Sequence, residues 1–338
     1  HLLELVNKTN IPVTTTLMAL GAFPGTHPLF AGMPGMHGSK LANICFQECD
    51  LVIAVGARFD DRVTGKLSAF APKAKIAHVD IDPSSIKKTV KVDYPVVGDA
   101  HWVLRELNKV VKPRQPNEWN RTFAEMKETH WFRYRPSTEV MRPQYVIEKI
   151  YEMTKGDAII STEVGQIQMW AAQFYKFDKP RRWLTSGGLG TMGYGFPAAI
   201  GAQFAAPDAM VIDIAGDGSI QMNIQELTTV VENRLPVKVV ILNNGYLGMV
   251  RQWQEFFYDR HYSSSVIGGL PDFAKVADAF GAKGLTARTH DDVVPVLEEG
   301  LAHPGPVFMD FHINPEENVF PMVPAGKALD EMQEEEWA

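Results

Sequence analysis

Cysteine and positive charge are scarce in this sequence, and each scarcity excludes a class of protein. Cys45 and Cys49 are the only cysteines in 338 residues, so a disulfide framework is excluded and a zinc site is disfavoured. We interpret them as two reduced packing thiols, which suits a reducing compartment. Lys and Arg number 33 against 40 Asp and Glu, for a net charge of −7, and this balance argues against a nucleic-acid-binding surface.

Long apolar runs and targeting patterns are also missing. No apolar run reaches the roughly 18 residues that a membrane-spanning helix needs, so we expect neither a membrane nor a nucleic acid as partner. The chain opens with HLLELVNKTN, without Met and without a targeting pattern, which predicts a piece cut from a longer polypeptide. We expect the protein in the cytoplasm, or in the plastid if its source is a plant.

Hydrophobic residues make up 45% of the sequence and charged residues 22%, as in ordinary globular proteins. Helical and strand patterns alternate along both halves, so we predict an α/β fold with two doubly wound parallel-sheet domains. The predicted boundaries are 1–112 for the first domain, 113–142 for a linker between prolines, and 143–338 for the second domain.

The expected elements follow from hydrophobic periodicity and from turn residues. In the first domain and linker we expect helices at 2–8, 37–49, 100–111 and 118–131, and strands at 11–15, 51–56 (buried), 76–80 and 95–98. In the second domain we expect helices at 143–154, 169–175, 219–233, 272–280 and 291–301, and strands at 158–161, 183–186, 210–215, 237–242 and 307–311.

The stretch 210–249 carries the clearest chemical pattern. Two strands lead into the turns Gly216-Asp217-Gly218 and Asn243-Asn244-Gly245, and a right-handed crossover brings both turns to the carboxyl edge of one parallel sheet. Asp217 offers a carboxylate and Asn244 a carboxamide oxygen, the hard ligands that Mg²⁺ shares with phosphates, and a helix N-terminus between the turns favours an anion. We predict a Mg²⁺-diphosphate site, although each motif alone is often a plain turn.

The spacing of these two turns resembles the diphosphate and metal motif of thiamine-diphosphate enzymes. The resemblance implies that Mg²⁺ is held by Asp217, Asn244 and the backbone carbonyl of Tyr246. It also implies that thiamine diphosphate contacts the turns, the segment after them and a glycine-rich loop. The residues implied for this cofactor are Val164, Gly165, Gln166, Gly190, Met192, Gly216, Gly218, Ser219, Leu247, Gly248 and Met249.

The glycine-rich loop admits a rival interpretation. Residues 188–193 form a G-x-G-x-x-G pattern with Asp213 twenty residues beyond it, as in a Rossmann dinucleotide site. A nicotinamide site explains neither Asp217 nor the second turn, so we set it aside. By the resemblance, Met192 is the apolar prop that bends thiamine diphosphate and Gly190 contacts its aminopyrimidine, with core packing as the alternative for Met192.

Three strand ends in the first half carry Gly, Arg or Asp that suit a nucleotide, with solvated loop charges as the alternative. The segments GMHG (35–38), GARFDDRVTG (56–65) and HVDID (78–82) resemble the middle domain of acetohydroxyacid synthase, a thiamine-diphosphate enzyme that contains FAD. The implied FAD contacts are Thr16, Leu17, Met18, Gly35, Met36, His37, Gly56, Arg58, Asp60, Val63, Asp80, Ile81 and Asp99. Arg62 is implied to recruit the second substrate through its carboxylate, with a salt bridge to a neighbouring Asp as the alternative.

Beyond the metal motif, Met249 and Trp253 are four residues apart and share a helix face. The resemblance implies that both face the substrate channel and that Trp253 favours 2-oxobutanoate as acceptor. We expect residues 256–270 to form a mobile cap, and the tail ENVFPMVPAGKAL also matches the family. The acidic run at 331–336 is expected to be a solvated end.

The reaction that the resemblance implies is decarboxylation of pyruvate and its condensation with pyruvate or 2-oxobutanoate, in branched-chain amino-acid biosynthesis. The products would be 2-acetolactate or 2-aceto-2-hydroxybutanoate and CO₂, with FAD in a structural role. The implied partners are small 2-oxo acids, further copies in a dimer or tetramer, and a small regulatory subunit. Pyruvate oxidase, glyoxylate carboligase and a non-catalytic cofactor-binding remnant are the alternatives.

Two residues depart from the family pattern. Ile167 stands where members generally have His, and Glu163 precedes Val164, which puts cofactor affinity or rate in doubt. In the family, the Glu that protonates the aminopyrimidine belongs to an N-terminal domain of the neighbouring subunit, and we expect this chain to lack that domain. We therefore expect this chain alone to be inactive.

Overall fold

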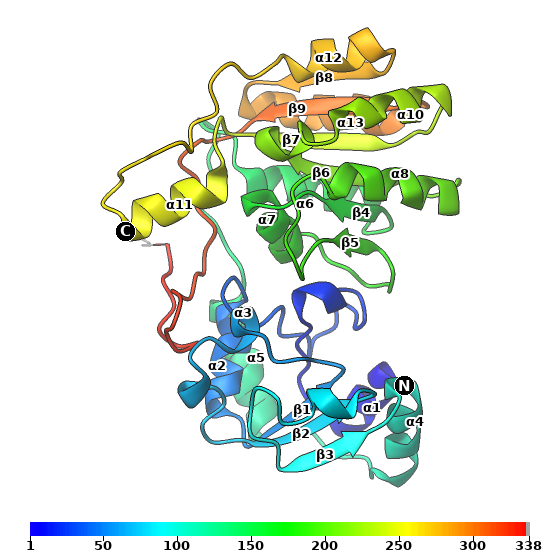
Figure 1. Cartoon of the computed structure of the whole chain (residues 1–338). Coiled ribbons are helices and arrows are strands. Elements are labelled where there is room, and N and C mark those ends of the chain that lie inside the picture. The colour runs from blue at the N-terminus through cyan, green and yellow to red at the C-terminus, as the bar shows by residue number, and fades with distance from the viewer. Residues whose placement is uncertain (336–338) are drawn as a thin grey trace. The chain divides into compact units, whose positions relative to one another are not determined.

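A computed structural model describes residues 1–335 of the chain. The chain divides into two units: His1–Arg133 together with the tail from Phe320 onward, and Tyr134–Val319. Each unit is built on a parallel sheet (Figure 1), so the α/β class is confirmed. Within the described residues, no helix is both long enough and apolar enough to cross a membrane.

The first unit contains a three-stranded parallel sheet in the order β1-β2-β3. Its strands run one after another in a single direction, so the doubly wound order predicted for this half is absent from its sheet. The strands are β1 (Leu51–Val55), β2 (Lys75–Asp80) and β3 (Tyr94–Val97). The helices are α1 (Leu2–Thr9), η1 (Leu17–Ala19), α2 (Lys40–Glu48), α3 (Asp61–Thr64), η2 (Leu67–Ala69), η3 (Pro83–Ser85), α4 (Ala100–Val110) and α5 (Glu118–His130).

One strand prediction in this unit is wrong, and another is wrong only about burial. Residues 11–15 do not form a strand, because Val13 makes only an isolated bridge with Phe30, and its hydrogen-bonding partner is an irregular loop that cannot extend a ladder. Strand β1 is not buried on both sides, since Leu51 and Ile53 are exposed while Val52 and Ala54 are buried. One uncovered face gives an alternating strand rather than the doubly covered one that the apolar run suggested.

The core of the first unit extends into the predicted linker and the tail. Phe123 of α5 packs with Leu41 and Ala42 of α2, and Val323 and Leu329 of the tail join the core under β1 and β2. In the acidic run at the chain end, Glu331 is exposed and accepts a hydrogen bond from the N–H of Ala328, whereas Glu336 lies outside the described residues.

The two cysteines lie in this unit, and both are free thiols. Burial raises the pKa of Cys45 to about 12 and that of Cys49 to about 11. Thiols that remain protonated are poor nucleophiles and poor metal ligands. The prediction of two reduced packing thiols is therefore confirmed.

The second unit holds a six-stranded parallel sheet in the order β5-β4-β6-β7-β9-β8. The chain starts at β4, moves outward to β5 and then crosses to β6 on the other side, which is the doubly wound order (Figure 1). The strands are β4 (Ile159–Thr162), β5 (Trp183–Thr185), β6 (Val211–Gly216), β7 (Lys238–Asn243), β8 (Lys283–Ala287) and β9 (Val307–His312). The helices are α6 (Pro143–Thr154), α7 (Gln166–Phe174), α8 (Gly195–Ala205), α9 (Asp217–Ile220), η4 (Ile224–Glu226), α10 (Leu227–Glu232), α11 (Gly248–Phe257), α12 (Phe273–Phe280), η5 (His290–Asp292) and α13 (Val293–Ala302).

Helices cover both faces of this sheet, which is why β7 is buried along its whole length. On one face, Phe196 of α8, Leu227 of α10 and Phe273 of α12 share a core with the strands. On the other face, α7 contacts β4 and β6, and α13 contacts β9. The continuous apolar runs of β6 and β7 thus reflect two covered faces.

Two element predictions in this unit are corrected. The single helix expected at 219–233 is broken into α9, η4 and α10, because Asn223 leaves the helical conformation at φ −138° and its carboxamide donates a 2.6 Å hydrogen bond to the carbonyl of Gly193. Strand β8 was missed, because its sequence KGLTA has no apolar run; it pairs at the sheet edge with β9 alone.

Candidate functional site

The two oxygen-rich turns meet at the carboxyl edge of the six-stranded sheet, as the sequence predicts. Strands β6 and β7 are parallel neighbours with Gly216 opposite Leu242. Asp217 is 1% exposed, and its carboxylate accepts hydrogen bonds from the N–H of Gly245 at 2.7 Å and from the N–H of Gly218 at 2.9 Å. One carboxylate therefore links both turns.

The oxygen atoms at this edge are hard ligands that fit a divalent cation. Burial raises the pKa of Asp217 to about 6, although the N–H groups of Gly245 and Gly218 act in the opposite direction. Within residues 1–335, no cationic side chain forms an ion pair with this carboxylate, so a bound cation would compensate its buried charge. The bridge between Tyr246 and Val266 uses the carbonyl of Gly245 and the N–H of Leu247, which leaves the Tyr246 carbonyl out of the bridge.

The expected metal site uses a single carboxylate. Among the described residues there is no group of three or more His, Cys, Asp or Glu side chains that could hold a metal ion. A site built from one carboxylate, one carboxamide and one carbonyl instead matches Mg²⁺, which completes its shell with water and phosphate oxygens. The ligand roles of Asp217, Asn244 and Tyr246 stay predictions.

Glycine backbones around this edge border open space. No atom lies within 4 Å of the place a Cβ would occupy at Gly165, Gly188 or Gly245, and at Gly190 only Val164 comes near, at 3.9 Å. Gly165 precedes the first turn of α7, so its neighbours present unpaired N–H groups. These backbones leave room for a ligand and donors to hold it.

Met192 lies beside the first turn and outside the core. It is half-buried, and its methyl group is 3.9 Å from the place of a Cβ at Gly218, where Leu247 and Ile267 approach to 3.0 and 2.8 Å. A Cβ at position 218 would require the terminal methyl group of Ile267 to shift. The role of Met192 as prop and its core-packing alternative both stay predictions.

We expect Asn223→Ala to loosen the glycine-rich loop and to lower the free energy of unfolding by about 1 kcal/mol, since the Gly193 carbonyl loses its carboxamide donor. Urea denaturation measures this change. Asn233→Ala is the matched control, because Asn233 also donates to a carbonyl, that of Thr229, but locally and at the surface. Equal losses in the two variants would contradict the role of Asn223.

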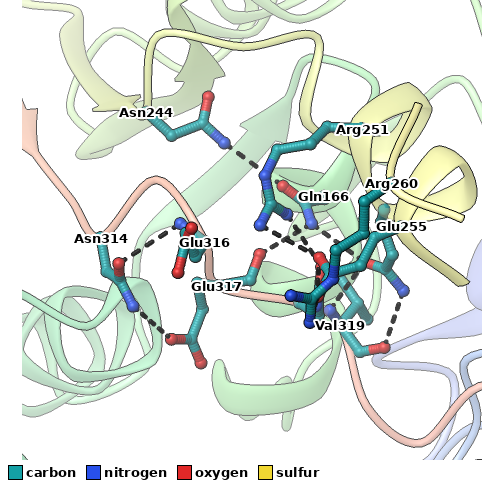
Figure 2. Close-up of polar contacts among 11 residues, drawn as sticks. Gln166, Asn244, Arg251, Glu255, Arg260, Asn314, Glu316, Glu317 and Val319 are labelled. Atoms are coloured by element: carbon teal, nitrogen blue, oxygen red, sulfur yellow. Dashed lines mark hydrogen bonds and ion pairs between the residues drawn. The ribbon is translucent and has the colours of Figure 1, made fainter. Parts of the chain in front are cut away.

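A chain of amides joins the metal turn to the segment before the tail (Figure 2). The Nδ2 of Asn244 donates to Oε1 of Gln166, and the Nε2 of Gln166 donates to Oε1 of Gln252 and to the carbonyl of Glu317, both at 2.9 Å. Gln252 in turn binds both the N–H and the carbonyl of Val319. Sequence reasoning found Gln166 and Asn244 but missed Gln252 and Glu317, which no local motif marks.

Arg251 is a second feature that sequence reasoning missed. Its guanidinium is buried, forms an ion pair with Glu255 at 3.1 Å and donates to Asn318 at 3.1 Å (Figure 2). The rings of Tyr246 and Tyr262 also lie within 6 Å of it. Arg251 therefore holds α11, the metal turn and the segment 258–270 together, and the i, i+4 spacing of Arg251 and Glu255 was its only signal.

Helix α11 carries Met249 and Trp253, which are both half-buried. The Trp253 ring packs against Phe257 at a centroid distance of 5.3 Å. Of the segment expected to form a cap, Ser265 and Ile267 are hydrogen-bonded to Leu247 and Gly245 beside the metal turn. The segment thus closes over the turn, while its mobility and the substrate contacts of Met249 and Trp253 stay predictions.

In the first unit, three implied FAD residues lie at one edge of the sheet. Gly56, Asp80 and Asp99 sit at or just beyond the carboxyl ends of the parallel strands β1, β2 and β3. Gly56 has φ 65° and open space at its Cβ position, and Ile81 is exposed. A glycine and acids at the carboxyl ends of parallel strands suit a nucleotide, and the FAD contacts stay predictions.

A second group of implied FAD residues meets around Arg62. The N–H of Met36 donates to the Arg62 carbonyl at 2.7 Å, and a Cβ at Gly35 would overlap the same carbonyl. Burial lowers the pKa of His37 to about 4, so its imidazole is neutral at pH 7. Asp60 accepts a hydrogen bond from the Arg62 N–H at the start of α3, beside Val63.

The arginines of this segment pair with neighbouring acids. Arg62 contacts Asp61 at 2.8 Å and Arg58 contacts Asp60 at 3.5 Å, with both guanidinium groups exposed. The salt-bridge alternative for Arg62 is therefore present in the structure, as a weak surface pair, and its substrate role stays a prediction. Thr16, Leu17 and Met18 lie at the short helix η1, and no described contact joins them to the strand ends.

The rival dinucleotide site is contradicted by Asp213. This residue lies inside β6 and is completely buried, and within the described chain neither carboxylate oxygen has a hydrogen-bond partner. A ribose-binding acid must stand at a strand end that a ligand can reach.

The two residues that depart from the family pattern are both buried. Ile167 lies in α7 and faces Gly216, and Glu163 is completely buried.

Comparison with known proteins agrees with this site. Residues 1–107 match the family model described as thiamine pyrophosphate enzyme, central domain, and residues 163–311 match thiamine pyrophosphate enzyme, C-terminal TPP binding domain. The chain is 45% identical over 98% of its length to the acetolactate synthase isozyme 3 large subunit of Escherichia coli K12, of which it covers 60%. It is 47% identical over 98% of its length to the acetolactate synthase of Mycobacterium bovis, of which it covers 56%.

The chain thus spans somewhat more than half the length of the curated relatives that it matches. The match to the C-terminal TPP binding domain covers the strand ends where Asp217 and Asn244 meet. The match to the central domain covers the edge at Gly56, Asp80 and Asp99. With acetolactate synthase large subunits among its relatives, this chain belongs to the thiamine pyrophosphate enzyme family.

Proposed function

We propose that this chain supplies the diphosphate-anchoring and FAD-contacting domains of an acetolactate synthase. The reaction is decarboxylation of pyruvate and condensation with pyruvate or 2-oxobutanoate, which gives 2-acetolactate or 2-aceto-2-hydroxybutanoate and CO₂. The observation that carries the proposal is the 2.7 Å hydrogen bond from Gly245 to Asp217, which unites the two turns of the diphosphate motif at one sheet edge.

The bound thiamine diphosphate supplies the chemistry, since its thiazolium accepts the electrons that decarboxylation releases. The residues of the chain bind and orient it. Asp217, Asn244 and the Tyr246 carbonyl hold Mg²⁺, and Gly190 and Met192 border the cofactor. Ile167 offers no polar atom at its position in α7, so the cofactor is held there without a side-chain hydrogen bond.

The proposal also covers FAD, a partner subunit, the choice of the second substrate and the localisation. FAD binds at the carboxyl edge of the β1-β2-β3 sheet, as the glycine and acids there suggest. A small regulatory subunit joins the assembly, since relatives such as the one from Haemophilus influenzae are named large subunits. Arg62 and Trp253 select the second 2-oxo acid, and the protein works in the cytoplasm.

Calorimetry with thiamine diphosphate tests the proposal directly. We expect saturable binding that needs Mg²⁺ and disappears with EDTA, because the diphosphate and the protein share the metal ion. A product assay with pyruvate on the full-length protein should then yield 2-acetolactate. Absence of Mg²⁺-dependent binding would refute the proposal, and binding without condensation in the full-length protein would favour a non-catalytic cofactor-binding protein.

A further inference from the structure

The second unit contains two acids that lie deep in the fold and that the proposed reaction does not use. Glu163 follows β4 and Asp213 lies inside β6, and both side chains are completely buried. Ser161 is the register neighbour of Asp213, and the N–H of Glu163 donates to the Ile214 carbonyl, so the two acids stand on adjacent strands.

Glu163 and Asp213 differ sharply in what surrounds them. The Glu163 carboxylate accepts hydrogen bonds from the N–H groups of Gly193 at 2.5 Å and Phe196 at 3.0 Å, so it binds the end of the glycine-rich loop and the first turn of α8. Neither oxygen of Asp213 has a partner among the described residues. The environment thus favours a charge on Glu163 and a proton on Asp213.

The start of α8 packs closely against both residues. A Cβ at Gly195 would lie 2.4 Å from Oδ1 of Asp213 and 2.4 Å from the N of Glu163. The helix backbone therefore seals this site and excludes solvent from both carboxyl groups. Burial raises the pKa of Asp213 well above its ordinary value, and the charge of Glu163 raises it further. Burial also raises the pKa of Glu163, against the opposing effect of its backbone donors.

Among the described residues, no cationic side chain pairs with either acid. The neighbouring side chains on β4, β5 and α8 are neutral, namely Ser161, Thr162, Thr185 and Phe196. On β7 the register neighbour of Asp213 is Val239, and the ammonium of Lys238 binds the carbonyls of His303 and Gly305 instead. Two like charges buried on adjacent strands without a cationic partner among the described residues repel each other, which favours a proton on one of them.

We propose that Glu163 and Asp213 form a buried acid pair that retains one proton at neutral pH, with Asp213 neutral and the Glu163 carboxylate anchoring the glycine-rich loop. Glu163 is the positioning residue for the loop that carries Gly190 and Met192, and this part of the inference rests on the proposed function. A proton on Asp213 removes the repulsion that would otherwise push Glu163 away from Gly193 and Phe196.

Unfolding as a function of pH tests the retained proton. The folded chain holds a proton that the unfolded chain releases above about pH 4, so stability falls as pH rises, by up to tenfold per pH unit in the unfolding equilibrium constant. In Asp213→Asn the tenfold-per-unit rise of the unfolding equilibrium constant that this one proton causes should be lost between pH 5 and 7. The exposed Asp208→Asn is the matched control and should keep the parent slope. An unchanged slope in Asp213→Asn would overturn the proposal.

Two further measurements test separately whether Asp213 holds a proton and whether Glu163 anchors the glycine-rich loop. The parent should show an infrared carbonyl band of a protonated carboxylic acid that Asp213→Asn removes, and its absence from the parent overturns the retained proton. Amide exchange at Gly193 and Phe196 should speed up at least tenfold in Glu163→Gln, since a carboxamide has one acceptor oxygen for two donors, and stay near the parent rate in Asp213→Asn. Equal exchange in the two variants overturns the anchoring role.

These experiments need no cofactor, so their outcome is independent of the proposed function. A thiamine diphosphate titration then links the pair to the cofactor site. Glu163→Gln should bind the Mg²⁺ complex at least tenfold more weakly, and Asp213→Asn within threefold of the parent. If the parent does not bind thiamine diphosphate, the proposed function fails while the acid pair stands on its unfolding, infrared and exchange data. If the parent binds and Glu163→Gln binds equally well, the positioning role is refuted.

Discussion

Asp217→Asn should abolish most of the Mg²⁺-dependent binding of thiamine diphosphate. The substitution keeps the size of the side chain but removes its charge, and it leaves one acceptor oxygen for the N–H groups of Gly218 and Gly245. Loss of a supporting residue around a metal typically costs about 10–100-fold in affinity, so we expect loss of a direct charged ligand to cost on the order of 100-fold or more.

Calorimetry of the variant with Mg²⁺ and thiamine diphosphate measures this loss. The control is Asp208→Asn, which makes the same chemical change at an exposed residue before β6 and should leave affinity unchanged. Because Asp217 is buried without a cationic partner among the described residues, the variant should also be at least as stable as the parent when no metal is present. An affinity within a few-fold of the parent would contradict the assignment of Asp217 as a ligand.

Two glycines of α8 should respond to alanine with opposite signs. Gly195→Ala places a methyl group 2.4 Å from Oδ1 of Asp213 and from the backbone N of Glu163, and the backbone of β4 cannot retreat from the sheet. We expect a loss of about 3 kcal/mol in the free energy of unfolding, at the upper end of typical overpacking costs. Gly201→Ala meets no atom within 4 Å and should gain about 0.5–1 kcal/mol from higher helix propensity.

Urea denaturation of both variants gives the two values in one experiment. The pair is internally controlled, since both substitutions lie in the same helix and change the same atoms. Loss at both positions would mean that α8 tolerates no added methyl group, and a gain at both would mean that α8 does not press on the acid pair.

The metal turn was predictable because its signal is local. Asp217 and Asn244 lie in turns that follow apolar strands, and the rule that parallel strands share a carboxyl edge places them together. The structure adds the hydrogen bond between the turns. The break at Asn223 was not predictable, since its partner Gly193 is thirty residues away in a loop whose position only the fold defines.

The buried polar groups also divide into features visible in the local sequence and contacts that only the fold defines. Gln252 and Arg251 lie in α11, but their partners, Val319 and Asn318, come from a segment far along the chain. No spacing rule connects them. The departure at Glu163 was visible in the sequence, but its meaning depended on Asp213. The burial of Asp213 depends on the position of α8, which only the fold defines.

The sequence by itself determined the α/β class, most of the helices and strands, and the family motif of the two turns, because periodicity and turn chemistry act over a few residues. Only the tertiary structure decided that residues 11–15 form no strand, that β1 has an exposed face, and that Glu163 and Asp213 are buried on adjacent strands where α8 begins. Each of these depends on which surface another part of the chain covers, and burial of that kind is a property of the assembled fold rather than of any local stretch.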